Sequence, residues 1–471
     1  MQVRRPLKAE TCRNFPDVIL RPSPKLYTPA FAIPFKGNFV FYFPLRRAAF
    51  LGNSAVAAFL RSLAEGSRGE FSEDEQGILN LLSSLGVLGE DGDADLSPSK
   101  TDPARPALAT LLCARACNLA CSYCYAEAGR MTGAPMTTAT AMKALDFVCR
   151  NAVETGAEFF GVDFHGGGEP TLNMPLVRAT LGYARKLARS HGLDAKFRAA
   201  TNGTFSDDTS AWLAGNFNGV SVSCDGLPEI HDRQRPFADG SPSSGRVLSN
   251  IARFNRAGSN FMVRMTVTAK SAERLAEGVE FLLKMGVPGP ILVEGVYDMG
   301  RALGRSLAPA APDFVSAFME AKSLADGAGV KLFTSTGRLD VLAERFCGVA
   351  SGNFCVLPDG GISACHEVFD QGLPYARDFL TGRMFEDGAV SLDSAVFTRL
   401  QNLRDEYSGW CVGCFARFHC AGDCLHLARR AAGDGPFSGH PRCETTRALV
   451  LAQLVEKIRE NGGVSWSGDR A

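Results

Sequence analysis

Between about residue 107 and residue 330, short apolar runs alternate with longer stretches in which apolar residues recur every three or four positions. The short runs have the length and the β-branched and aromatic content of strands. They cover residues 108–112, 159–164, 196–200, 219–223, 261–267 and 291–296. Helical spacing follows in between, for example at 138–154, 174–190 and 272–285. Six strand-then-helix units predict an α/β fold with a parallel sheet, and six fit a partial (β/α)6 TIM-like barrel better than an eight-fold one.

The first 90 residues have a different pattern. Residues 35–43 are strand-like, with aromatic and β-branched residues around Gly37 and Asn38. Residues 54–63 and 72–85 have helical apolar spacing. Strands followed by short helices predict a small winged-helix-like α+β domain. The polar stretch 89–105, rich in Asp, Ser and Pro, is expected to be a linker.

Composition and charge narrow the range of partners. The 471 residues contain 50 basic and 50 acidic side chains, and this balance favours neither nucleic acid nor an anionic membrane as a partner. We find no window of some twenty uncharged apolar residues that predicts a transmembrane helix, and no apolar signal segment after the basic residues 1–6. A cytoplasmic location is therefore expected. The 15 cysteines are clustered, which in a reducing compartment favours metal binding over disulfides.

Three of these cysteines follow the first predicted strand. Cys117, Cys121 and Cys124 form a C-x3-C-x2-C run. Cysteine thiolates hold iron–sulfur clusters, and three ligands on a four-iron cluster leave one iron open for chemistry. The alternative is a zinc site, which needs a fourth ligand such as Cys113.

The cysteine run, with an aromatic residue before its last cysteine, resembles the signature of radical S-adenosylmethionine (SAM) enzymes. The second predicted strand is followed by His165-Gly-Gly-Gly-Glu-Pro170, which resembles the GGEP motif of that family. The resemblance implies that Gly167, Gly168 and Glu169 hold the amino group of SAM.

Polar residues at the ends of later strands extend the resemblance. Asn202 and Ser223 are expected to bind the ribose and carboxylate of SAM, and residues 221–233 resemble the "SLDG…HD.R" stretch of peptide-modifying members. Arg264 looks like the family arginine that pairs with the carboxylate of SAM, with a surface salt bridge as the alternative. Tyr123 is expected near the adenine, with a core tyrosine as the alternative.

The C-terminal third resembles the SPASM domain. Its cysteine pattern is C-x12-G-x4-C, then C-x2-C-x5-C-x3-C, then C. By resemblance to sulfatase maturases, one auxiliary four-iron cluster would be held by Cys347, Cys355, Cys365 and Cys424. The other would be held by Cys411, Cys414, Cys420 and Cys443. If Cys355 is not a ligand, the first cluster has an open iron; a pair of structural zinc sites is the alternative.

The resemblance implies three [4Fe-4S] clusters, SAM as a cofactor, and three domains. These would be residues 1–90, a candidate peptide-recognition domain; 105–330, the radical SAM barrel; and 340–450, the SPASM domain. An electron donor such as flavodoxin or ferredoxin would reduce the first cluster. SAM would then be cleaved to a 5′-deoxyadenosyl radical, which takes a hydrogen atom from the substrate.

The residues after Cys365 affect the choice of substrate. Sulfatase maturases have an aspartate base directly after this cysteine, whereas this chain has His366 and then Glu367. Either side chain is a candidate general base, and a surface pair is the alternative. The departure favours a maturase that cross-links a ribosomally made precursor peptide. A maturase of a sulfatase or dehydrogenase subunit, and a non-enzymatic metal-bearing binding protein, remain alternatives.

Overall fold

The computed structural model describes residues 29–65, 70–89, 102–128, 133–459, 463–466 and 469–470, and it divides into two compact units. The barrel unit comprises Thr101–Ser335 and Cys347–Asp405, and the terminal unit comprises Met1–Lys100, Thr336–Phe346 and Glu406–Ala471. Residues 90–101 of the predicted linker lie outside the described residues. The predicted C-terminal region 340–450 contributes residues to both units.

The described part of the barrel unit is built on an 11-stranded sheet with the order β10-β9-β8-β7-β6-β5-β4-β12-β13-β14-β15. Its parallel strands are β4 (Leu108–Leu111), β5 (Phe159–Phe164), β6 (Asp194–Thr201), β7 (Gly219–Ser223), β8 (Phe261–Val267), β9 (Ile291–Gly295), β10 (Leu332–Phe333) and β12 (Phe354–Val356). The antiparallel extension is β13 (Gly361–Ser363), β14 (Leu380–Met384) and β15 (Val390–Leu392). The six predicted strands are confirmed, with β6 beginning two residues earlier than expected.

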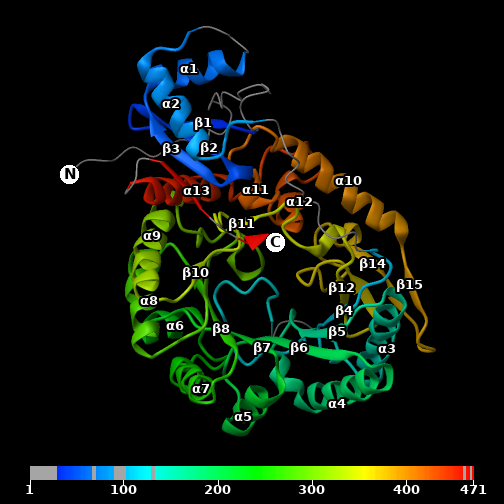
Figure 1. Ribbon diagram of the computed structural model, residues 1–471. Coiled ribbons are helices and arrows are strands. Elements are labelled where there is room, and N and C mark those ends of the chain that lie inside the picture. Colours follow the sequence, from blue (N-terminus) through cyan, green and yellow to red (C-terminus); the bar gives the residue numbers. More distant parts are fainter. Residues whose placement is uncertain are drawn as a thin grey trace. The chain divides into compact units, whose positions relative to one another are not determined.

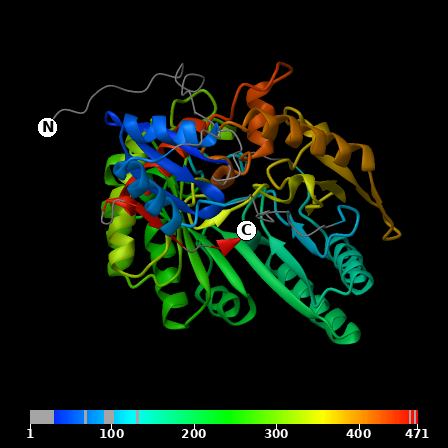
Figure 2. The same cartoon turned by 45° about the horizontal axis from the view of Figure 1, so that its top comes forward.

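Helices cover the outer side of the parallel strands (Figure 1). The strands themselves form one curved sheet (Figure 2). They are α3 (Thr138–Thr155), α4 (Met174–His191), α5 (Asp207–Asn216), α6 (Pro228–Gln234), α7 (Ser244–Arg256), α8 (Leu275–Lys284) and α9 (Ala311–Gly327). Short 3-10 turns lie at Pro170–Asn173, Ala272–Arg274, Gly300–Ala302, Gly348–Ala350 and Ala376–Asp378. The predicted helix 272–285 is therefore a 3-10 turn followed by α8. This arrangement agrees with the predicted partial barrel.

Local sequence sets the ends of these helices, and their apolar faces bury the sheet. The Thr137 hydroxyl accepts from the Thr140 amide and begins α3, and Gly156 ends it in the left-handed conformation. Leu145 of α3 and Leu181 of α4 pack with Val162 of β5 in one buried cluster. This packing holds the strands in place, and the predicted site residues lie at their carboxyl ends.

The terminal unit joins the first strands of the chain to its last helix. Strands β1 (Phe31–Phe35), β2 (Asn38–Phe43), β3 (Ala48–Gly52) and β16 (Gly463–Ser465) form an antiparallel sheet, with a 3-10 turn at Pro44–Arg46. The other elements are α1 (Ser54–Ala64), α2 (Glu73–Ser84), α11 (Arg417–Cys420), α12 (Leu425–Ala432), α13 (Cys443–Ile458), β11 (Val341–Leu342) and β17 (Asp469–Arg470). Helix α10 (Ser394–Trp410) runs across the boundary between the units in the sequence.

The two faces of this sheet are buried by different helices. Phe41 and Phe50 pack with Leu60 of α1 on one face, and Tyr42 packs with Leu454 of α13 on the other. The Tyr42 hydroxyl also bonds the His419 ring. Figure 1 shows α13 on the opposite side of the sheet from α1 and α2.

The predicted strand-like stretch 35–43 belongs to a hairpin. Lys36 and Gly37 form its turn with φ of 49° and 79°, the left-handed values that a tight hairpin turn requires. The predicted helices 54–63 and 72–85 are confirmed as α1 and α2. The winged-helix interpretation stays a prediction. No described helix of the chain has the length and apolar character needed to cross a membrane.

Candidate active site

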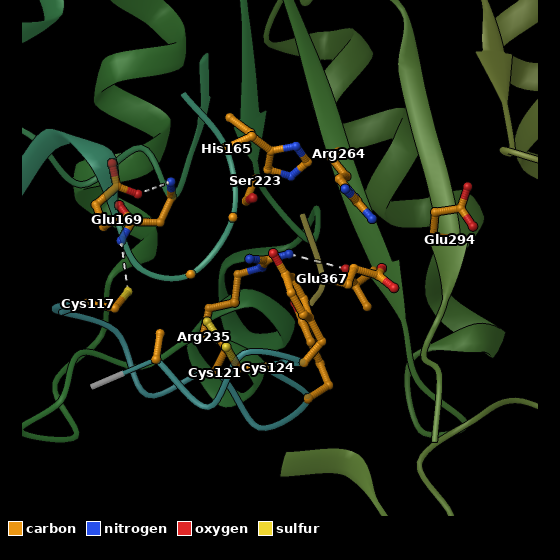
Figure 3. A pocket seen from close by; sticks show the side chains of 18 of the residues that line it. Cys117, Cys121, Cys124, His165, Glu169, Ser223, Arg235, Arg264, Glu294 and Glu367 are labelled. Atoms are coloured by element: carbon orange, nitrogen blue, oxygen red, sulfur yellow. Dashed lines mark hydrogen bonds between the residues drawn. The ribbon is translucent and has the colours of Figure 1, made fainter. Parts of the chain in front are cut away.

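One pocket in the barrel unit lies at the carboxyl ends of the parallel strands, where such folds place their chemistry. Its empty volume is about 1080 Å³, a figure that includes space open to solvent. Its lining includes residues from the loop after β4, the turn after β5 and the strands β6 to β9. Figure 3 shows the side chains that surround this space.

The three cysteines of the C-x3-C-x2-C run line this pocket together. Cys117, Cys121 and Cys124 are free thiols. Burial is the main cause that raises the pKa of Cys117 to about 11 and that of Cys121 to about 12, and the neighbouring thiols raise both further. Since the charge of Cys124 acts on both other thiols and that of Cys117 acts on Cys121, the three side chains lie close together. Cys113, the fourth ligand of the zinc alternative, is buried outside the lining, with its Sγ 4.0 Å from the Pro170 carbonyl oxygen.

The glycine turn after β5 packs directly against the start of the cysteine loop. The Gly168 amide donates to the Ala114 carbonyl at 2.8 Å, and the Glu169 amide donates to the Ala116 carbonyl at 2.9 Å. A Cβ atom on Gly168 would lie only 2.0 Å from the Ala116 oxygen. Gly167 has a φ of 69°, which favours glycine. The turn therefore needs glycine for its own close contact with the cysteine loop.

Glu169 is buried at the base of the pocket and is already held by four donors. Its Oε1 accepts from the Thr171 amide and hydroxyl at 3.1 and 2.7 Å, and from the Thr201 hydroxyl at 2.7 Å. Its Oε2 accepts from the Asn202 amide at 2.7 Å. Burial raises the pKa of Glu169, and these hydrogen bonds oppose the rise. Since a carboxylate oxygen can accept two bonds, Oε2 retains one acceptor position for a ligand.

The predicted residues Asn202, Ser223, Arg264 and Tyr123 also line the pocket. Asn202 Nδ2 lies 3.7 Å from Cys117 Sγ and donates to Asn118 Oδ1 at 2.8 Å, so it connects the end of β6 to the cysteine loop. The Tyr123 hydroxyl donates to Asp225 at 2.5 Å. The structure thus brings every predicted SAM contact into one place.

Of the two candidate bases, Glu367 lines the pocket, whereas the His366 ring stacks on His165 with centroids 4.2 Å apart. His165 does line the pocket. Burial, followed by the charges of His366 and Arg264, lowers the pKa of His165, so its ring is neutral. The sequence indicated no role for His165, and it did not point to Tyr125, Glu294 and Tyr297, which also line the pocket.

The C-terminal cysteines are distributed over both units. In the terminal unit, Cys411, Cys414, Cys420 and Cys443 lie together: after burial and the charge of Asp423, the charges of the other three thiols contribute to raising the pKa of Cys420. In the barrel unit, the charge of Cys347 helps to raise the pKa of Cys355, so these two are neighbours. Cys365 follows β13 of the barrel unit, and Cys424 belongs to the terminal unit.

Comparisons with known proteins support the interpretation of this pocket as a radical SAM site. The model of the Radical SAM superfamily matches residues 111–282, from the end of β4 into α8. An uncharacterized protein of Methanocaldococcus jannaschii is 29% identical over 172 residues, or 36% of this chain and 56% of that protein. A cysteine-type anaerobic sulfatase-maturating enzyme of Clostridium novyi is 27% identical over 161 residues, or 34% and 42%. The chain thus spans about half the length of these two relatives.

A longer match links the chain to mycofactocin maturase MftC of Mycobacterium tuberculosis, which is 26% identical over 345 residues, or 70% of this chain and 80% of that one. Among solved structures, native anSMEcpe with bound AdoMet and Cp18Cys peptide gives a TM-score of 0.59 at 16% identity, covering 75% of this chain and 99% of the other. Streptococcus suis SuiB bound to precursor peptide SuiA gives 0.52 at 14% identity, covering 87% and 96%. At these identities the solved structures share the fold. The chain contains a radical SAM domain and is similar to maturases.

Proposed function

We propose that this protein is a radical SAM maturase that oxidatively modifies a ribosomally made precursor peptide. The observation that carries the proposal is the meeting of three free thiols, the glycine turn and Glu169 in one pocket. A binding scaffold has no need of an acceptor for an ammonium group beside a cysteine cluster. The sequence relationship to maturases supports the choice of substrate class.

The residues present fit an iron–sulfur cluster. Cys117, Cys121 and Cys124 would hold it, and the Leu119 amide, 3.4 Å from Cys117 Sγ, would stabilise that thiolate. Cysteine must lose its proton to bind metal, so metal binding would overcome the raised pKa values. Gly167, Gly168, Glu169, Asn202, Ser223 and Arg264 would hold SAM, with Tyr123 beside them. When bound, the reduced cluster and SAM supply hydrogen-atom abstraction from an unactivated carbon.

The chain's own residues prepare the pocket for this chemistry. The hydrogen bonds from Thr171, Thr201 and Asn202 fix the Glu169 carboxylate before a ligand arrives, which lowers the cost of binding. Glu367 and His366 are the candidates for accepting a substrate proton. An external one-electron donor of the flavodoxin or ferredoxin type would supply the reducing electron.

Loss of Glu169 is expected to weaken SAM binding. In Glu169→Ala the ammonium acceptor is gone and the buried donors of Thr201 and Asn202 lose their partner. A hydrogen bond to a charged group contributes roughly 1.5–3 kcal/mol, so we expect the Kd for SAM to rise about 10- to 100-fold. Calorimetry on the reconstituted protein measures this, with the exposed Glu229→Gln as the control. An unchanged Kd in Glu169→Ala would refute the assignment of the SAM site.

The C-terminal cysteines are proposed to hold two auxiliary clusters. We then expect about twelve iron and about twelve sulfide per chain after anaerobic reconstitution, because three four-iron clusters are present. Metal and acid-labile sulfide analysis measures both. About four of each, with zinc making up the rest, would instead make these cysteines structural zinc ligands.

The proposed substrate class is tested by giving the enzyme a precursor peptide and, separately, a sulfatase or dehydrogenase subunit. A short peptide encoded beside the gene should lose hydrogen atoms, seen by mass spectrometry, in a reaction that needs SAM and reductant. Solved complexes of anSMEcpe and SuiB contain peptides, which supports this choice. If a sulfatase or dehydrogenase subunit is modified and the peptide is not, the enzyme is a protein maturase.

A further inference from the structure

A buried ion pair, one partner of which lines the same pocket, was not anticipated from the sequence. Arg235 Nε lies 3.0 Å from Asp225 Oδ2, and the two side chains are 8% and 1% exposed. Removing one partner of such a pair leaves an uncompensated buried charge, and burying both partners costs desolvation energy. We therefore expect the pair to have a role in the site.

Asp225 is fixed by several further donors. Its Oδ2 also accepts from the Tyr123 hydroxyl at 2.5 Å and from Gln234 Nε2 at 2.7 Å. Its Oδ1 accepts from the Thr266 amide at 2.9 Å. Burial alone would raise the pKa of Asp225, but Arg235, His231 and these hydrogen bonds keep it below its ordinary value. Asp225 is therefore an ionised anchor for the guanidinium group.

The segment that carries Arg235 is joined to the cysteine loop through the backbone. The Ser122 amide donates to the Gln234 carbonyl at 2.9 Å, and the Ala120 amide donates to the Pro236 carbonyl at 2.8 Å. Leu119 also forms an antiparallel bridge with Phe237. Arg235 thus cannot move independently of Cys121, which lies between two of these bonds.

The charge of the pair is oriented toward the thiols. Arg235 lines the pocket together with Cys121 and Cys124, whereas Asp225 does not line it. Figure 3 labels Arg235 beside Cys121 and Cys124. The guanidinium also lies over the Tyr123 ring, 5.1 Å from its centroid. The positive end of the ion pair therefore faces the cysteines, and the negative end is held away from them.

We propose that Arg235 is a positioning residue whose fixed positive charge raises the reduction potential of the cluster held by Cys117, Cys121 and Cys124, with Asp225 limiting that effect. The inference depends on the proposed function, because it assumes that these thiols hold a redox cluster. Reduction adds one electron, supplied by a one-electron donor, and hence one negative charge. A nearby positive charge stabilises the reduced form more than the oxidised form, since net charge and its surroundings set cluster potentials.

The test compares two substitutions with opposite expected signs. In Arg235→Met the positive charge is lost, and the one-electron reduction equilibrium should become about tenfold less favourable, a shift of about −59 mV. In Asp225→Asn the guanidinium keeps its charge without its counter-charge, so the potential should shift in the positive direction. Dithionite titration without SAM, monitored by electron paramagnetic resonance, measures both.

Two control variants separate the effect of the Arg235 charge on the reduction potential from any effect of a changed structure. Arg235→Lys should keep the wild-type potential, and Arg233→Met, which changes an exposed arginine in α6 two residues before Arg235, should leave it unchanged. If Arg235→Met and Asp225→Asn shift the potential in the same direction or not at all, the inference is wrong. If the Arg235→Met variant does not bind a cluster, the Asp225→Asn variant tests the inference alone. A positive shift of its reduction potential supports the inference, and a negative shift or none contradicts it. A wild-type protein without a redox-active cluster would instead overturn the proposed function itself.

Discussion

Cys121→Ala is expected to abolish reductive cleavage of SAM, whereas Cys113→Ala should retain near wild-type cleavage. The Cys121 thiol lines the pocket with Cys117 and Cys124, so its loss leaves two ligands where a cluster needs three. The Cys113 thiol is only 2% exposed and lies against Pro170 rather than in the pocket. Chromatographic measurement of 5′-deoxyadenosine, together with the iron content of each variant, tests the difference.

The same pair of variants tests the zinc alternative. A four-thiol site that includes Cys113 predicts that both substitutions remove the metal equally. Equal losses would therefore contradict the three-cysteine assignment. Because Cys113 and Cys121 are both buried, general destabilisation should affect the two variants similarly, and melting temperatures identify it.

Gly168→Ala is expected to disrupt the site as severely as loss of a ligand. The added Cβ would lie 2.0 Å from the Ala116 carbonyl oxygen. The backbone on both sides of this contact is held by hydrogen bonds from the Gly168 and Glu169 amides. Relief requires the turn to move away from the cysteine loop, at a cost of roughly 1–3 kcal/mol or more. We expect loss of bound iron and of SAM binding, measured by metal analysis and calorimetry.

Gly182→Ala in α4 is the matched control. Apart from the chain neighbours and backbone of its own helix, no atom lies within 4 Å of the Cβ it would add, and alanine is favoured over glycine in a helix by up to about 1 kcal/mol. This variant should keep its iron and gain slightly in melting temperature. If Gly168→Ala behaves in the same way, the close contact seen at Ala116 is not required.

The barrel and the centre of its site could be predicted because both depend on local patterns. The alternation of apolar runs located β5, β7 and β8 at their observed bounds. The carboxyl ends of parallel strands share one edge, so motifs that follow β4 and β5 had to meet. The C-x3-C-x2-C run and the glycine turn each carry their chemistry in a few consecutive residues, so each motif could be recognised from the sequence alone.

The remaining features depend on contacts between distant parts of the chain. Nothing next to Asp225 or Arg235 in sequence indicates that the two side chains pair, because the pairing depends on how α6 packs beneath the cysteine loop. Gly168 was assigned to SAM alone, whereas the structure shows that it also permits contact with Ala116. The bond between Tyr42 and His419, 377 residues apart, likewise has no signal in local periodicity.

The burial of β1–β3 against α13 and β16 has a consequence for the synthesis of the chain. Ala49, whose side chain packs in the same cluster as Val450, leaves the ribosome 401 residues before Val450, and at about 5–20 residues per second this interval lasts roughly 20–80 s. During that time one face of the first sheet and the edge of β3 lack their native cover. We therefore expect the nascent segment 31–52 to depend on protection by chaperones or by the ribosome until α13 and β16 have been synthesised.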